Sequence, residues 1–282
     1  MPAHNRNLAI CVDMGKDIPI HERILSIKDA GFDGVFTDWQ NDKSYIKNLA
    51  KFIRDNGLFY QSVHASFSKI DKMWERSELA YNKLNELKRC VEDCSDNEID
   101  LMISHVWVGF EEEHPNEIGV ENFAKLIEYA KPLGVRIALE NTEGESYLKR
   151  LTDELYYMDN VGFCIDTGHE MCYNKSEDLI HRYGENGKLF CTHLNDNMGI
   201  TTEKIFWHDD AHLMPFDGIA DWGGVARRLK EVCYNDTLTF ELTSVSKPNR
   251  DTHKIYENLD YKGFFKSAYE KAVKFAALCE EN

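Results

Sequence analysis

The sequence has no long apolar segment, no surplus of basic residues and no C-x-x-C motif, and each absence removes a class of protein. None of its apolar runs reaches the roughly 18–20 residues that a membrane-spanning helix needs. The first seven residues, Met1–Asn7, are polar and lack the apolar core of a signal peptide. The eight cysteines are spread over 282 residues, a length at which a disulfide scaffold is not expected. We therefore predict a protein of the reducing cytoplasm that does not associate with membranes.

The shortage of positive charge bears on the partners of the protein. The chain contains 33 Lys and Arg against 49 Asp and Glu, a formal net charge of −16. A protein that coats nucleic acid needs clustered Lys and Arg against the phosphates, so this balance disfavours a nucleic-acid partner without excluding a local basic groove. Hydrophobic residues make up 43% of the sequence and charged residues 29%, which is the composition of a globular domain.

Eight short apolar runs alternate with longer helical stretches along the whole chain. Such runs are typical of strands that are covered on both faces of a parallel sheet. The predicted strands are Leu8–Val12, Gly34–Thr37, Phe59–Val63, Leu101–Ser104, Arg136–Leu139, Val161–Ile165, Leu189–Thr192 and Thr237–Phe240. The predicted helices are His21–Ala30, Lys43–Asn56, Met73–Cys94, Glu121–Lys131, Gly144–Leu155, Ser176–Tyr183, Gly224–Val232 and Tyr261–Glu280.

Three architectures fit this alternation: an open doubly wound sheet, a closed eightfold barrel, or two smaller α/β domains. A doubly wound fold with a dinucleotide site would place G-x-G-x-x-G after the first strand, and Asp13–Asp17 does not match that motif. No linker rich in Pro, Gly or Ser divides the chain. We therefore predict a single (β/α)8 TIM barrel domain over residues 1–282.

Polar residues with acid–base or metal-binding chemistry recur at the carboxyl ends of the predicted strands. In a barrel these ends meet at one mouth, where the active sites of this fold lie. Imidazoles and carboxylates are ligands for Zn²⁺, Mn²⁺ or Mg²⁺, and a cation would relieve the repulsion among so many carboxylates. Each residue alone is more often an ordinary loop residue, and only their recurrence in register favours a metal site. The residues are His64, His105, Glu140, Asp166, His169, His193 and Glu241.

A second cluster lies in the long segment after the seventh predicted strand. Asp210 and His212 can present two further ligands from one extended stretch, although an ordinary acidic loop explains them equally well. Aromatic residues near the strand ends predict an apolar wall for the C–H face of a polyol, with packing inside the loops as the alternative. The residues of this predicted wall are Trp39, Phe67, Trp107 and Trp207.

In their order and spacing, several segments resemble the xylose isomerase-like barrels, which include sugar isomerases and epimerases and also endonuclease IV. These segments are Gly31–Val35, Val63–Ala65, Leu139–Asn141, Ile165–His169, Thr192–Asn197, Asp210–His212 and Phe240–Glu241. The resemblance implies one divalent ion, such as Mn, Zn, Mg or Co, and a role for His169 facing the substrate or the metal. The implied ligands of that ion are Glu140, Asp166, His193 and Glu241.

The resemblance implies two different activities. In an isomerase or epimerase of a sugar or sugar phosphate, Glu140 and Glu241 would remove and return a proton next to a carbonyl, through an enediolate that the metal stabilises. In the nuclease branch, three zinc ions occupy nine positions and act at abasic DNA. All nine positions are filled by residue type in this chain, namely by His64, His105, Glu140, Asp166, His169, His193, Asp210, His212 and Glu241.

The chain also departs from both branches. Epimerases commonly carry Glu at the end of the second strand, where this chain has Thr37-Asp38-Trp39. The nuclease needs a basic groove, whose candidates alternate with acidic residues in the sequence. These candidates are Lys69, Lys72, Arg76, Lys204 and Arg250. We therefore expect a small-molecule sugar substrate, with the nuclease and a purely structural metal site as alternatives. A homo-oligomer is compatible with each of them.

Overall fold

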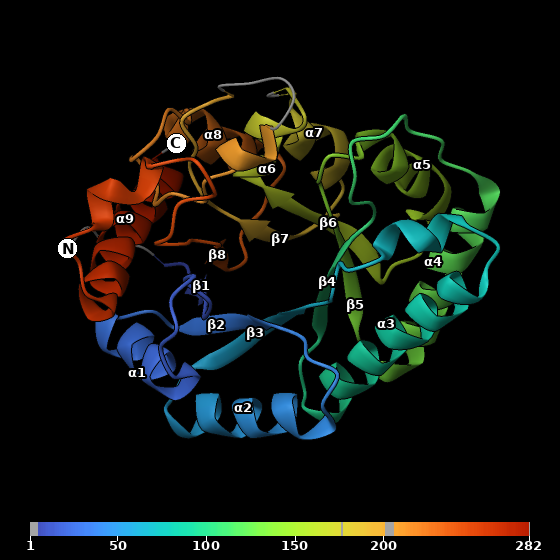
Figure 1. Cartoon of the computed structure of the whole chain (residues 1–282), viewed down its shortest axis with the longest axis horizontal. Coiled ribbons are helices and arrows are strands. Elements are labelled where there is room, and N and C mark those ends of the chain that lie inside the picture. The colour runs from blue at the N-terminus through green and yellow to red at the C-terminus, as the bar shows by residue number, and fades with distance from the viewer. Residues whose placement is uncertain (1–4, 176, 201–205, 282) are drawn as a thin grey trace.

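A computed structural model of the chain describes residues 5–175, 177–200 and 206–281 and shows a barrel of parallel strands surrounded by helices (Figure 1). The strands form one sheet in the order β7-β6-β5-β4-β3-β2-β1-β8. Their bounds are β1 (Leu8–Cys11), β2 (Gly34–Asp38), β3 (Phe59–His64), β4 (Leu101–His105), β5 (Arg136–Glu140), β6 (Val161–Asp166), β7 (Leu189–His193) and β8 (Leu238–Phe240). The prediction of a (β/α)8 barrel is confirmed.

The barrel closes between β7 and β8 through a short seam. Leu194, the residue after β7, bridges in parallel to Phe240, and its N–H donates to the carbonyl of Thr239 at 2.9 Å. The Oγ1 of Thr192 accepts from the N–H of Thr239 at 3.0 Å. The hydroxyl group of Thr192 thus takes the place of a backbone carbonyl as the acceptor of this N–H. The pairing of β7 with β8 therefore consists of an isolated bridge and not of a continuous ladder.

Helices pack around the outside of the sheet (Figure 1). Within the described residues they are α1 (Ile20–Ala30), α2 (Lys43–Asp55), α3 (Glu78–Asp96), α4 (Glu117–Ala130), α5 (Glu145–Leu155), α6 (Thr167–Cys172), α7 (Leu179–Gly184), α8 (Trp222–Glu231) and α9 (Tyr261–Glu281). Short 3₁₀ helices are η1 (Ile70–Trp74), η2 (Lys131–Leu133), η3 (Phe206–Asp209) and η4 (Thr252–Tyr256). No helix in this part of the chain combines the length and the apolar character needed to cross a bilayer.

Two helices begin directly after a capping residue and not at the predicted positions. α3 begins at Glu78 and not at Met73, because the Oγ of Ser77 accepts the N–H of Ala80 at 3.2 Å. α4 begins four residues earlier than predicted, since Asn116 accepts from an N–H of its first turn at 3.2 Å. In both cases a capping side chain sets the boundary.

The region after β6 differs most from the prediction. The six-residue helix α6 was not predicted, and it begins directly at the strand end, where the carboxylate of Asp166 accepts the N–H of His169 at 2.7 Å. The predicted helix Ser176–Tyr183 corresponds to α7, which starts at Leu179; Ser176 itself lies outside the described residues. The cap and the first turn of α6 therefore place two predicted site residues, Asp166 and His169, on a rigid element.

The two faces of the sheet have different surroundings. Residues such as Ile137 and Leu139 belong to the large apolar layer that the sheet shares with the helices. Ala138 and Glu140 alternate with them and therefore point to the barrel interior. A small separate cluster, Leu101, Ile103, Ala138, Cys164 and Cys191, fills that interior. The inside of the barrel is thus apolar at its centre and polar at the carboxyl ends of the strands.

The strand register brings the polar residues to one level at the mouth. Three directly paired positions are Asp38 with His64, His105 with Glu140, and Asp166 with His193. Parallel pairing puts such partners side by side, so each of these three strand pairs contributes neighbouring polar groups. The site described below follows from this register.

Candidate active site and metal centre

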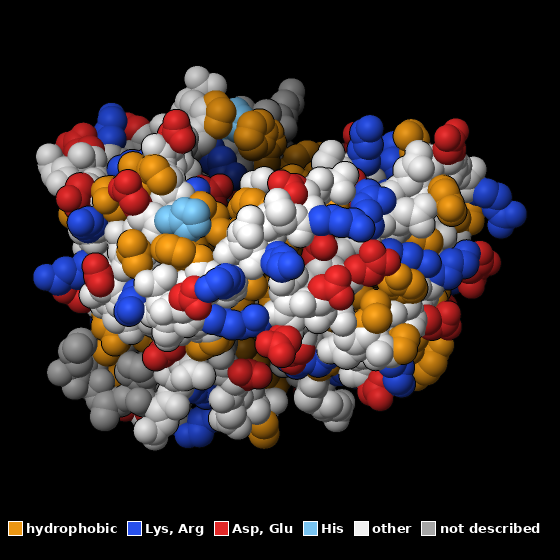
Figure 2. Space-filling view, turned by 90° about the horizontal axis from the view of Figure 1, so that it is seen from below, with side chains coloured by type: hydrophobic (Ala, Val, Ile, Leu, Met, Phe, Trp, Pro, Cys, Tyr) orange, Lys and Arg blue, Asp and Glu red, His pale blue; other side chains and the backbone are white. Residues whose placement is uncertain are grey.

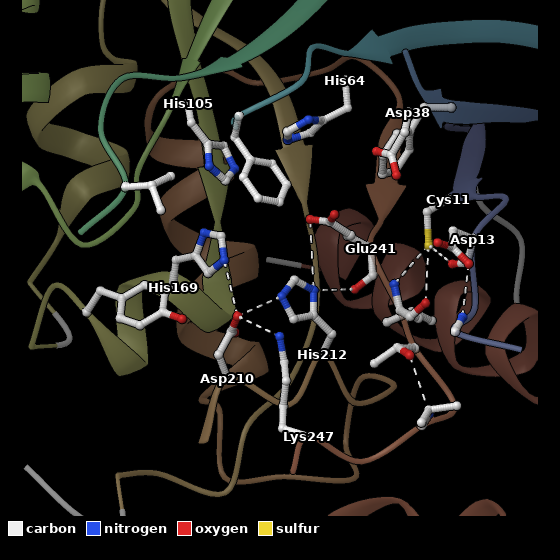
Figure 3. A pocket seen from close by; sticks show the side chains of 18 of the residues that line it. Cys11, Asp13, Asp38, His64, His105, His169, Asp210, His212, Glu241 and Lys247 are labelled. Carbon is white, nitrogen blue, oxygen red and sulfur yellow. Dashed lines mark hydrogen bonds and ion pairs between the residues drawn. The ribbon is translucent and has the colours of Figure 1, made fainter. Parts of the chain in front are cut away.

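A cavity of about 570 Å³ opens at the carboxyl ends of the strands (Figure 3). The carboxyl ends of all eight strands, or the segments that follow them, contribute to its walls. Its lining contains four of the predicted histidines, His64, His105, His169 and His212, together with Asp210 and Glu241. The location agrees with the position of active sites in TIM barrels.

The four residues predicted to share one ion lie together at the base of this cavity. Glu140, Asp166, His193 and Glu241 each offer one ligand atom, and these atoms lie within 4.8 Å of one another. The Nδ1 of His193 is 2.9 Å from an oxygen of Glu140 and 3.1 Å from an oxygen of Glu241. The side chains of Glu140, Asp166 and His193 are fully buried, whereas that of Glu241 is 25% exposed toward the cavity.

The hydrogen-bonding capacity of this group fits a cation. A single Nδ1 hydrogen faces two carboxylates, and the carboxylate of Asp166 is a third negative group in the same small volume. Burial raises the pKa of Asp166 to about 6, which reflects the free energy needed to keep it charged without a cation. Three carboxylates and one imidazole are a donor set that Mn²⁺, Zn²⁺, Mg²⁺ or Co²⁺ can use.

Two further histidines flank this group through Glu140. The Nε2 atoms of His64 and His105 lie 3.0 and 3.3 Å from the same oxygen of Glu140. Burial would raise the pKa of Glu140, but the surrounding imidazoles, His193 first, outweigh it and hold that pKa well below its usual range. Burial would likewise lower the pKa of His64, but the hydrogen bond to Glu140 raises it to about 9. Glu140 is therefore shared between its flanking histidines and the four-residue group.

The remaining predicted residues form a second flanking group around Asp210. One oxygen of Asp210 lies 3.0 Å from the Nε2 of His212 and 3.4 Å from the Nε2 of His169 (Figure 3). Asp166, His169 and His212 also have ligand atoms within 4.8 Å of one another. The structure thus brings all nine sequence-predicted residues to one cavity, in a central group with one flanking group on each side.

Asparagines hold the central carboxylate in place. The amide of Asn195 donates to Asp166 Oδ2 at 2.7 Å. The side chain of Asn141 brackets the backbone of Asp166, since it accepts from its N–H at 2.8 Å and donates to its carbonyl at 3.0 Å. Asn195 thus orients the carboxylate of Asp166 and Asn141 holds its backbone. Residues that contact metal ligands in this way commonly fix the ligand orientation at metal sites.

We expect Gly168→Ala to weaken metal binding by about tenfold or more. Losses of this size are typical when a residue that hydrogen-bonds a metal ligand is disturbed. A Cβ at Gly168 would overlap the Oδ1 of Asn195, which holds Asp166. The matched control is Gly223→Ala in α8, where the nearest side-chain atom to the new Cβ is 3.6 Å away. Competition with a chelating dye measures the metal affinity of both variants. Equal metal affinities of Gly168→Ala and Gly223→Ala would show that Asn195 does not support the site.

The predicted aromatic wall is wrong for its three tryptophans. Only Phe67 of the four residues lines the cavity, where its ring stacks on His105 with centroids 4.9 Å apart. Trp39 is buried and donates to Asp93 at 2.8 Å. Trp107 stacks on Tyr147 at 4.1 Å, and Trp207 packs edge-on against its neighbour His208. Each tryptophan finds its partner within the loops or the outer layer, so nearness in sequence to a strand end does not bring its ring to the cavity.

Several residues of the cavity were not predicted as site residues. Asp13 and Asp38 follow the first two strands, and the signal that selected the other strand-end residues applies to them equally. Glu143, Tyr173 and Lys247 reach the cavity from loops and helix ends, and no sequence pattern pointed to them. Burial raises the pKa values of Glu143 and Tyr173.

Of the candidate cations of a nucleic-acid groove, those that the structure describes do not line the cavity. Lys72 pairs with Asp71 and Glu75 at 2.9 and 2.7 Å, and Arg250 donates to Asp209 at 2.6 Å. Lys69 and Arg76 are absent from the described lining, and Lys204 lies outside the described residues. On the face in Figure 2, Lys and Arg are interspersed with Asp and Glu rather than gathered in one patch.

Residues 24–261 match the model of a family described as the xylose isomerase-like TIM barrel. The chain belongs to this family. The match includes β2 to β8 and all nine residues of the cavity clusters. The family resemblance that the sequence segments predicted is therefore confirmed.

Two curated sequences are similar to this member of the family. The uncharacterized protein y4fM of Sinorhizobium fredii is 35% identical over 114 residues, covering 38% of this chain and 33% of the relative. The inosose isomerase of Bacillus velezensis is 24% identical over 215 residues, covering 69% of this chain and 75% of the relative. The chain thus spans only a third of the length of y4fM.

Several solved structures share the fold of this chain. The IOLI protein with a bound zinc atom has a TM-score of 0.74 and 18% identity, over 98% of both chains. An L-ribulose 3-epimerase has a TM-score of 0.72 and 21% identity, over 98% of this chain and 97% of that chain. In a fusion of such a barrel with a 4-hydroxyphenylpyruvate dioxygenase, the match covers 89% of this chain and 41% of the other, with a TM-score of 0.69 and 18% identity.

Proposed function

We propose that the protein is a divalent-metal-dependent isomerase or epimerase of a sugar-like ketone. The observation that carries the proposal is the convergence of Glu140, Asp166, His193 and Glu241 beneath one cavity. The inosose isomerase relative and the solved L-ribulose 3-epimerase support this class of substrate, and the zinc atom of the IOLI structure supports a metal at such a site.

The two proposed acid–base residues differ in their access to the cavity. Glu241 lines the cavity and is 25% exposed, so it can take a proton directly from a substrate carbon. Glu140 is fully buried, and its oxygen contacts His64 and His105, which line the cavity above it. A proton would therefore pass between Glu140 and the substrate by way of His64 or His105.

The four-residue group would hold the divalent ion. Such an ion, when bound, polarises neighbouring carbonyl and hydroxyl oxygens and makes the adjoining C–H more acidic. The protein residues would orient the substrate, exclude water and move protons. Glu241 would accept the proton of the substrate on one side, and a different proton, held between Glu140 and its histidines, would be delivered on the other. Phe67 supplies an apolar surface against which C–H groups can pack.

Solvent exchange tests this proposal directly. We expect the metal-loaded protein to incorporate deuterium from D₂O next to the carbonyl of at least one compound in a panel of ketopentoses, ketohexoses and inososes, detected by NMR. Proton abstraction at a carbon precedes any net isomerisation, so exchange reports the chemistry even for a poor substrate. No exchange across the panel, with metal content verified, would reject the proposed reaction.

One observation keeps abasic-site hydrolysis as a second candidate. His64 with His105, and His169 with His212, flank the central group in the arrangement that a three-metal centre would need. Against it stand the net charge of −16 and a described lining with Lys247 as its single Lys or Arg. We expect no nicking of an abasic duplex at low salt, the condition that most favours binding to phosphates.

A further inference from the structure

Two cysteines meet inside the barrel, on the neighbouring strands β6 and β7 (Figure 1). Cys164 and Cys191 are directly paired, because the register of the two strands shifts by one residue between Phe163 and Cys164. Such an irregularity changes the direction of the side chains that follow it. Both cysteines belong to the small apolar cluster at the centre of the barrel and are fully buried. The shift therefore brings two thiols together in the barrel interior.

The imidazole of His193 lies next to this pair of thiols. His193 is two residues after Cys191 on β7 and therefore points to the same face of the sheet. One ring nitrogen of His193 and the two sulfur atoms lie within 4.8 Å of one another. The ring of Phe36 stacks on that of His193, with centroids 4.7 Å apart and an angle of 10° between the planes. This contact holds the imidazole in a fixed plane.

The contacts of His193 show which nitrogen is free for a ligand. Its Nδ1 can donate a proton to Glu140 at 2.9 Å or to Glu241 at 3.1 Å. A neutral imidazole with its proton on Nδ1 carries a lone pair on Nε2, on the other side of the ring. Among the described residues, no hydrogen-bond partner reaches this buried Nε2. A buried acceptor without a partner costs free energy, and a cation bound to it would remove that cost.

The composition of the cluster selects the kind of cation. Thiol and imidazole groups together suit soft ions such as Cu⁺. Zinc sites in proteins are almost always four-coordinate, and the cluster neighbours Leu101, Ile103 and Ala138 offer no fourth ligand. The amide of Gln61 donates to the sulfur of Cys191 at 3.3 Å, a contact that stabilises a thiolate. Exchange of one thiol proton for one monovalent cation also leaves the net charge of the apolar interior unchanged.

We propose that Cys164, Cys191 and the Nε2 of His193 form a second metal site, which binds Cu⁺ below the group proposed for the divalent ion. This site goes beyond the proposed function and does not depend on which reaction the protein catalyses. A divalent ion on Nδ1 would place the ring proton on Nε2, where it blocks the copper site. The two ions therefore compete through one imidazole, and each lowers the affinity for the other by the same factor.

Copper titration of the full chain tests the site. The protein carries Cys233→Ser, which removes the exposed cysteine, and is kept reduced and free of oxygen after treatment with a chelator. Cu⁺ is supplied in competition with bicinchoninate. We expect one equivalent to bind, with two sulfur atoms and one nitrogen around it in X-ray absorption at the copper edge. Prior loading with Mn²⁺ should weaken Cu⁺ binding by about tenfold.

Variants identify the ligands. Cys164→Ala and Cys191→Ala should each weaken Cu⁺ binding by at least about tenfold, the loss expected when even a neighbour of a ligand is disturbed, and should each remove one sulfur from the copper environment. Cys90→Ala in α3 changes another buried cysteine, outside the metal-binding groups of the described residues, and should bind Cu⁺ normally. Far-UV circular dichroism verifies the fold of each variant.

Several outcomes would overturn the proposal. These are no Cu⁺ binding by the Cys233→Ser protein, copper without sulfur neighbours, or equal affinities of Cys164→Ala and Cys90→Ala. Tighter binding of Zn²⁺ than of Cu⁺ by the same three groups would overturn the choice of a monovalent ion. Deuterium exchange reports separately on the proposed reaction, so absent exchange with an intact copper site would reject the reaction and leave the copper site in place.

Discussion

Glu241→Gln and Glu140→Gln are each expected to lower solvent exchange by about 10³-fold, the contribution typical of a positioned acid–base group. Glutamine has nearly the shape of glutamate but cannot accept the substrate proton. Both residues also belong to the group proposed to hold the ion, so each substitution removes one negative ligand. The measurement is the initial rate of deuterium incorporation into the best ketone of the panel, at a metal concentration that saturates each variant.

The two variants should differ in a second readout. Glu140 is fully buried and has three imidazole nitrogens within 3.3 Å, whereas Glu241 has one, that of His193 at 3.1 Å, and faces the cavity. We therefore expect Glu140→Gln to reduce metal affinity more than Glu241→Gln does. Glu257→Gln, at an exposed position, is the matched control and should exchange normally. Far-UV circular dichroism verifies the fold. A folded, metal-loaded variant that retains exchange within tenfold would remove that residue from the acid–base role.

Removal of the metal is expected to have the second large effect, on both activity and stability. A chelator should abolish exchange, and added Mn²⁺, Zn²⁺, Co²⁺ or Mg²⁺ should restore it. Binding to the folded state at a thousandfold excess over Kd stabilises a protein by about 4 kcal/mol. For a chain of this size, that corresponds to a fall in Tm of about 10 °C on chelation. The physical reason is the repulsion among three buried carboxylates that share one imidazole.

Metal stoichiometry separates the two candidate functions. Elemental analysis of protein purified without chelator should give about one divalent ion for the isomerase and about three zinc ions for the nuclease. His64→Gln should leave a single-ion stoichiometry unchanged, because His64 lies outside the four-residue group. His181→Gln in α7 is the control for an imidazole remote from the cavity. Three ions in the unmodified protein, with a loss of one in His64→Gln, would favour the nuclease.

The strands were predictable because their burial leaves a direct mark on the sequence. Most of their residues are buried and apolar, and each observed boundary lies within one residue of the prediction. The helix boundaries were less accurate, since they depend on single capping contacts such as that of Ser77. The short helix α6 has too few residues to show a periodic pattern, and its cap, Asp166, is also a proposed ligand.

The site was predictable to a similar extent. Seven of the nine clustered residues could be selected because parallel strands end on one side of a barrel, so polar residues at these ends must meet. Asp210 and His212 were selected separately, as a pair of potential ligands in the long segment after β7. Asp13 and Asp38 obeyed the same rule and were overlooked. The tryptophans were misplaced because the direction of a loop side chain is set by its packing partner, such as Asp93 for Trp39. Glu143, Tyr173 and Lys247 reach the cavity through loop conformations that local sequence does not encode.

The amino-acid sequence alone determined the barrel, its family and the residues that gather at the mouth, because strand burial and strand ends repeat at regular intervals along the chain. Only the tertiary structure decided how these residues divide among a central group and two flanking ones, and which of the two glutamates faces the cavity. Those properties depend on distances between side chains from different strands, which register and loop packing set and no single segment contains.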